Sequence, residues 1–180
     1  MKRKIAIFLM MISIIVSIFS IWYFTPKRYS ETVNGVYYQL GTEGIIERIK
    51  VHLDGKLQNH INGKKTFTGV INFEGSKVPQ IPKDRTELKL HYDGHNFTTI
   101  FSGFRIIIDD KGRIEPNIFT YGWVYTDDKF SEFTIKVMDD NDQWSPSNGH
   151  MITTAPANDR QEAMKRSQEL IKEFEEESRN

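Results

Sequence analysis

The chain has 180 residues, with 24 Lys and Arg against 24 Asp and Glu, and it contains no cysteine. This length suits one domain, and the lack of cysteine excludes disulfides, thiolate metal sites and a cysteine nucleophile. Three of the basic residues precede Ile5, so the rest of the chain carries about three excess negative charges. This balance disfavours nucleic acid or anionic lipid as the main partner, because both select clustered Lys and Arg, but it leaves room for a local basic patch.

Residues 5–24 predict a transmembrane helix. The segment has no charged residue, and its 20 residues span the hydrocarbon core of a bilayer when they are helical. Trp22 and Tyr23 close the segment with aromatic side chains, which favour the membrane interface, and Lys27 and Arg28 follow where their charges reach the lipid headgroups. We therefore expect the lipid bilayer to be the partner of this segment.

The charges at the two ends of this segment predict its orientation. Residues 1–4 carry more positive charge than the residues just after the segment, so the positive-inside rule places the N-terminus in the cytoplasm. Residues 25–32 then form a juxtamembrane linker, and the domain that follows is extracytoplasmic, held by a signal-anchor in the cell membrane. A cleaved signal peptide is the competing interpretation, although Ser20 preceded by Ile18 makes a poor cleavage site.

Residues 33–138 predict an antiparallel β domain, because apolar residues alternate with polar ones along short segments. Asp54-Gly55, Asp93-Gly94 and Asp110-Lys111-Gly112 have the composition of tight hairpin turns. The candidate strands are 36–40, 45–53, 67–73, 86–92, 97–101, 104–108, 118–125 and 130–137.

The segment 74–84 interrupts this pattern with two prolines, which cannot donate hydrogen bonds within a sheet. We expect this linker to cross between sheets. A twisted sheet of this many strands tends to curl or split, so the predicted fold class is mainly β, an antiparallel β-sandwich or partly open barrel.

Residues 139–157 are predicted to form a loop, and residues 158–177 a C-terminal helix packed on the β domain. Asn158 is the expected N-cap, with Gln161 three residues further on as in a capping box. The apolar residues at helical spacing are Ala163, Met164, Leu170, Ile171 and Phe174.

The loop contains the residues that most resemble a ligand or partner site. Asp140 and Asp142 are carboxylates of the kind that bind calcium, but the spacing lacks the glycine and the closing Glu of an EF-hand, so a solvated loop is the simpler interpretation and no metal site is expected. Trp144 and His150 flank Pro146 and Gly149 in the same loop, so one interpretation is an aromatic lid over a groove. The commoner role of such a Trp is to pin its loop to the sheet.

The sequence contains no nucleophile elbow, zinc-protease motif or phosphate-binding loop, and no cofactor is expected. The leading interpretation is therefore a membrane-tethered extracytoplasmic β domain that binds or assembles with an envelope protein or wall component. One alternative is an envelope hydrolase that uses carboxylates distant in sequence. Another is an accessory subunit of a membrane complex, paired through its N-terminal helix.

Residues 34–57 and 144–170 resemble small membrane-anchored proteins of Bacillus-type bacteria. The resemblance implies a Gram-positive cell surface. It implies no catalytic residue.

Overall fold

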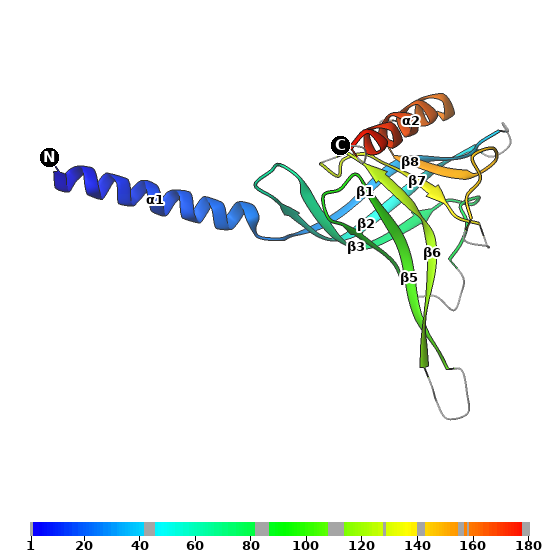
Figure 1. Ribbon diagram of the computed structural model, residues 1–180, viewed down its shortest axis with the longest axis horizontal. Helices are drawn as coiled ribbons and strands as arrows, with labels where there is room; N and C mark the ends of the chain where they lie inside the picture. Colours follow the sequence, from blue (N-terminus) through cyan, green and yellow to red (C-terminus); the bar gives the residue numbers. More distant parts are fainter. Residues whose placement is uncertain are drawn as a thin grey trace.

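The computed structural model describes residues 2–41, 46–81, 87–107, 114–127, 129–139, 143–154, 157 and 159–177. Figure 1 shows a helix that extends away from a β-barrel and a second helix that lies across the outside of the barrel. The elements are α1 (Lys2–Phe24), β1 (Lys27–Gln39), β2 (Ile46–Asn59), β3 (Lys65–Glu74), β4 (Leu88–Tyr92), β5 (Phe97–Ile107), β6 (Ile114–Thr126), β7 (Phe133–Val137), β8 (His150–Thr154) and α2 (Arg160–Glu177).

The helix α1 is long and apolar enough to cross a membrane. Its segment Arg3–Phe24 has 22 residues, and the apolar part of it is 0% buried against the rest of the protein. Pro26 lies two residues after the end of the helix, where its missing N–H and its steric restriction on Thr25 end helical structure. The predicted N-terminal helix is therefore confirmed.

The eight strands form a closed barrel in which each strand pairs antiparallel with the next one along the chain. β8 returns to pair with the second half of β1, at Gly35–Gln39, and this pairing closes the barrel. The mainly β class is confirmed, and the barrel is closed. The linker between β3 and β4 joins neighbouring strands of this one sheet, so the prediction that it crosses between sheets is wrong.

Four local predictions require correction. β1 begins at Lys27, so most of the predicted juxtamembrane linker 25–32 is part of a strand. The candidate strands 97–101 and 104–108 are one strand, β5, and β8 lies within the predicted loop 139–157. The predicted turn at Asp54-Gly55 lies inside β2. In contrast, Gly94 has a φ of 93° between β4 and β5, which confirms the turn at Asp93-Gly94. The predicted turn at residues 110–112 lies outside the described residues.

Side chains fill the interior of the barrel. Every strand contributes, because alternate residues of each strand point inward. The largest of the fully buried residues that belong to this interior core are Tyr37, Tyr92, Phe67, Phe133, Leu53, Ile71, Leu88, Leu90, Ile100, Ile135 and Ile152. The barrel is therefore a packed scaffold.

The linker 75–81 covers the end of the barrel opposite α1. Val78 is buried in the interior core, and Glu47 at the start of β2 holds the linker in place. The Glu47 carboxylate accepts hydrogen bonds from the backbone amides of Ser76 and Lys77, each at 2.7 Å. The Ser76 hydroxyl also donates to this carboxylate, and this hydrogen bond, together with the two from the amides, lowers the pKa of the Glu47 carboxyl.

The helix α2 packs on the outer faces of β1, β6, β7 and β8. Asp159 caps it, because its side-chain oxygen accepts hydrogen bonds from the amides of Gln161 and Glu162 at 2.8 and 2.9 Å. Asn158, the predicted cap, lies outside the described residues. Ala163 and Leu170 are fully buried, which confirms that the helix packs on the β domain; the side chain of Phe174 is not described.

Candidate functional site

A groove runs between α2 and the outer face of the barrel, and we call it the α2 groove. Its volume is about 170 Å³. The strand alternation that sends Ile135 and Ile152 into the barrel leaves Lys136 and Met151 on the outer face, under the helix. The groove is lined by Tyr38, Leu40, Lys136, Trp144, Met151, Met164, Ser167, Gln168 and Ile171.

Lys136 places a positive charge in this mostly apolar groove. Its amine lies 4.5 Å from the centre of the Trp144 ring and 4.9 Å from the centre of the Tyr125 ring, so two aromatic faces hold it by cation–π attraction. Partial burial lowers the pKa of Lys136 below its ordinary value, and the opposing effect of the nearby Glu175 is smaller. The groove therefore combines an apolar surface with one cation of fixed position.

Trp144 has two roles in the structure. Its indole N–H donates a hydrogen bond of 3.2 Å to the backbone oxygen of His150, which ties the loop before β8 to that strand. Its ring also packs against the outer apolar cluster that includes Val36 and Met151, and it lines the α2 groove. The sequence offered pinning of the loop and a lid over a groove as alternatives. The hydrogen bond to His150 shows the pinning, and the lid stays a prediction.

His150 does not share this groove with Trp144. Its Nδ1 atom lies 2.8 Å from the Tyr37 hydroxyl, and the two rings are stacked with centres 5.6 Å apart. Tyr37 belongs to the interior core, so the sheet separates the His150 ring from the α2 groove. Burial lowers the pKa of His150, which favours its neutral form. Asp140 and Asp142 lie outside the described residues.

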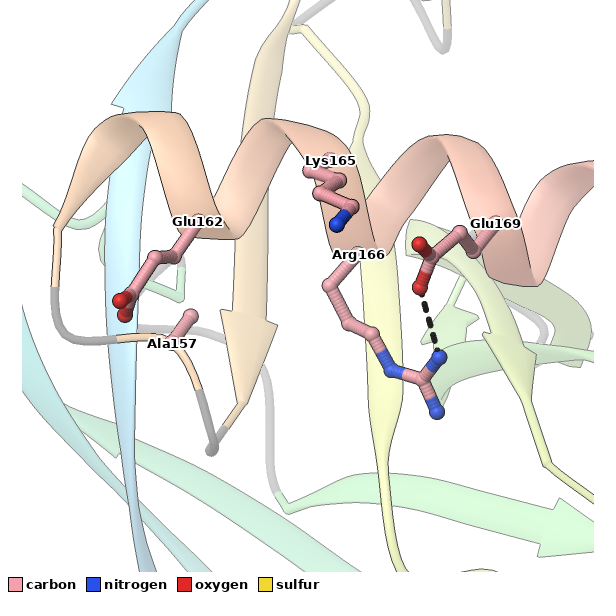
Figure 2. A pocket seen from close by; sticks show the side chains of 5 residues that line it. All are labelled: Ala157, Glu162, Lys165, Arg166 and Glu169. Atoms are coloured by element: carbon pink, nitrogen blue, oxygen red, sulfur yellow. Dashed lines mark hydrogen bonds and ion pairs between the residues drawn. The ribbon is translucent and has the colours of Figure 1, made fainter.

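A second hollow, of about 260 Å³, lies on the other side of α2 (Figure 2). It is lined by Ala157, Glu162, Lys165, Arg166 and Glu169. The guanidinium of Arg166 forms one ion pair with Glu169 at 2.8 Å and another with Glu132 from the β6–β7 turn. Two carboxylates thus neutralise this arginine, so we assign the hollow a structural role in fastening α2 to the barrel.

The predicted membrane-interface residues gather at the end of α1. The Lys27 amine lies over the Trp22 ring, 3.3 Å from its centre, and the backbone oxygen of Tyr23 accepts a hydrogen bond from Asn59. Arg28 lies 3.8 Å from Asp54 in an exposed ion pair, which is a weak interaction in water.

Sequence reasoning missed Lys136, Met164 and Gln168 as groove residues. A signal was present for Lys136, which is the one charged residue of strand β7. Its role depends on α2 folding back over the strand, and no local pattern in the sequence encodes that contact.

No three His, Asp or Glu side chains lie close enough together to hold a metal ion within the described parts of the chain. The chain matches no family model, no curated protein and no solved structure. The α2 groove is therefore the candidate site on geometry alone.

Proposed function

We propose that this chain is a membrane-tethered binding module of the cell envelope and that the α2 groove is its binding site. The observation that carries the proposal is the pairing of an apolar groove with the Lys136 cation, built on a barrel whose interior is already filled. Because side chains fill the interior, a ligand must bind on the outside of the barrel.

The size of the groove favours a protein partner. Pockets for small molecules usually measure about 300–1,000 Å³, and the α2 groove, at about 170 Å³, is smaller than these. A groove of this size suits one large apolar side chain, which is how anchor residues bind at protein interfaces. A carboxylate beside that anchor would pair with Lys136. The expected ligand is thus an acidic segment of an envelope protein that presents one apolar side chain.

The location in the envelope rests on α1 and on the charges around it. A retained α1 with its basic N-terminus in the cytoplasm holds the barrel on the outer side of the membrane. The resemblance of residues 34–57 and 144–170 to anchored proteins of Bacillus-type bacteria supports a Gram-positive surface. A module in that place meets membrane and wall proteins.

Site-specific photocrosslinking in the native membrane tests this proposal. A photoreactive amino acid at Gln168, which lines the α2 groove, is compared with the same amino acid at Lys165, which lines the other hollow of α2. We expect a defined crosslinked protein at Gln168 and not at Lys165. Lys136→Glu should abolish this product and Lys136→Arg should retain it.

Two results would contradict the proposal. One is the same set of products at both positions, and the other is a Gln168 product that Lys136→Glu leaves unchanged. The melting temperature of each variant is measured in parallel, so that a loss of folding is not mistaken for a loss of binding.

A further inference from the structure

The β2–β3 turn lies beside the end of α1. The Asn59 side chain, at the last position of β2, donates a hydrogen bond of 3.3 Å to the backbone oxygen of Tyr23, in the last turn of α1. Figure 1 shows this turn reaching back from the barrel toward the end of the helix. If α1 spans a bilayer, the tip of this turn lies at the level of the membrane interface, because Trp22 and Tyr23 mark that level.

The tip presents an exposed isoleucine. Ile61 is 93% exposed, so its side chain contributes nothing to the core. The turn that carries it is well ordered by backbone hydrogen bonds, from His60 to the oxygen of Lys64 at 2.9 Å and from Gly63 to the oxygen of His60 at 3.1 Å. Gly63 has a φ of 81°, which glycine adopts without strain. The protein thus holds a large apolar side chain in a fixed outward position.

Basic and polar groups surround this isoleucine. Lys64 and Lys65 follow it, and the β4–β5 turn packs alongside, since a Cβ added at Gly94 would lie 3.3 Å from the Cβ of Lys64. Residues of both turns line a polar hollow of about 220 Å³ that includes His95, whose ring pairs with Asp93 at 2.9 Å. An apolar tip flanked by lysines is the pattern by which proteins dip into the headgroup layer of anionic membranes.

We infer that this end of the barrel rests on the bilayer that holds α1, with Ile61 inserted among the headgroups and Lys64 and Lys65 against lipid phosphates. The inference rests on the retained anchor of the proposed function and adds a second membrane contact to it. Two contacts fix the tilt of the barrel. The β7–β8 loop, at the opposite end of the barrel, then points away from the membrane.

Single-cysteine labelling tests this contact, because the chain has no cysteine of its own. The full chain is reconstituted in vesicles of phosphatidylcholine and phosphatidylglycerol, with an environment-sensitive dye at Ile61→Cys, at Gln143→Cys in the β7–β8 loop, or at Ile14→Cys within α1. Lipids that carry a nitroxide at headgroup depth should quench the Ile61→Cys dye severalfold more than the Gln143→Cys dye. Lys64→Glu combined with Lys65→Glu should reduce that quenching.

The three positions separate failure of the inference from failure of the anchor. A dye at Ile14→Cys that is buried in lipid, with a dye at Ile61→Cys as exposed to water as the one at Gln143→Cys, would overturn the second contact and leave the anchor intact. If the dyes at both Ile14→Cys and Ile61→Cys are exposed to water, α1 does not span the membrane, and both the anchor and the inference are wrong. Circular dichroism of each labelled protein confirms that the barrel is folded.

Discussion

The hydroxyl groups of Tyr38 on β1 and Ser167 on α2 lie 2.6 Å apart in a buried hydrogen bond that ties the last helix to the first strand. The Ser167 oxygen also lies 2.7 Å from the hydroxyl oxygen of Thr153 and 3.0 Å from that of Thr134. One serine therefore joins three strands to α2, and the position of the α2 groove depends on it.

Ser167→Ala should lower the free energy of unfolding by about 1–3 kcal/mol, because it removes the hydrogen bonds that the Ser167 hydroxyl makes to three buried hydroxyl groups. Urea unfolding followed by tryptophan fluorescence measures this change. Lys165→Ala, at an exposed position two residues earlier in α2, is the matched control and should stay within about 0.5 kcal/mol of the wild type. Equal unfolding free energies for the two variants would show that the hydroxyl cluster does not hold the helix.

Strands were easiest to predict from the sequence where one face of the strand is buried and the other is exposed to solvent. β4 shows this pattern, with Leu88, Leu90 and Tyr92 buried between exposed residues, and it was predicted. β8 was missed because four of its five residues are buried: Ile152 faces the interior, and Met151 and Thr153 lie under α2. A strand that is covered on both faces by distant segments loses the alternation that reveals it.

The error at Asp54-Gly55 has a different cause. A Cβ at Gly55 would lie 2.4 Å from the backbone oxygen of Thr68 and 2.7 Å from the Cα of Gly69, so this glycine allows two strands to approach closely inside the sheet. An Asp-Gly dipeptide is typical both of a tight turn and of a close approach between two strands. Which of the two it forms depends on the partner strand, and the local sequence does not show that strand. The α2 groove could not be predicted for the same reason, since it forms between segments that are far apart in sequence.

The barrel should fold without α1, because the apolar part of that helix is not buried against the rest of the protein. A fragment that starts at Thr25 should be soluble and give a circular dichroism spectrum dominated by β structure. Loss of the hydrogen bond between Asn59 and Tyr23 should cost about 1 kcal/mol at most. Aggregation of the fragment, or a helical spectrum, would contradict this independence.

Phe130 is expected to be a critical residue at the α1 end of the barrel. Its ring stacks on Phe67 and Tyr92, each with centres 5.0 Å apart, and its φ of 52° is rare for a bulky residue. Phe130→Ala should destabilise the fold by about 3–5 kcal/mol through loss of this packing.

Phe130→Gly provides a control for the backbone. Glycine adopts positive φ without strain, so this variant should be about 1 kcal/mol more stable than Phe130→Ala. Differential scanning calorimetry of the soluble fragment compares the two. An alanine variant that is the more stable would show that the left-handed conformation at this residue costs nothing.

Stability should fall in mild acid because of His150. Burial lowers its pKa below the ordinary value of 6.5, so the unfolded state binds the proton more readily than the folded state does. The stabilising contribution is complete above pH 6.5 and decreases as the pH falls through the interval between the two pKa values. His150→Gln should flatten the dependence of melting temperature on pH from about 7 to 5. An unchanged slope in the variant would assign the effect to other groups.

Retention of α1 with the barrel on the outer side of the membrane underlies both the proposed binding function and the inferred second membrane contact. Labelling of intact, wall-stripped cells with a membrane-impermeant maleimide, followed by mass measurement of the labelled protein, tests it most directly. Gln143→Cys in the β7–β8 loop should react on intact cells, and Lys4→Cys should react only after lysis. The labelled protein should have the mass of the full chain. A mature chain that begins near Ile21, or the reverse pattern of labelling, would contradict the anchored and outward-facing arrangement.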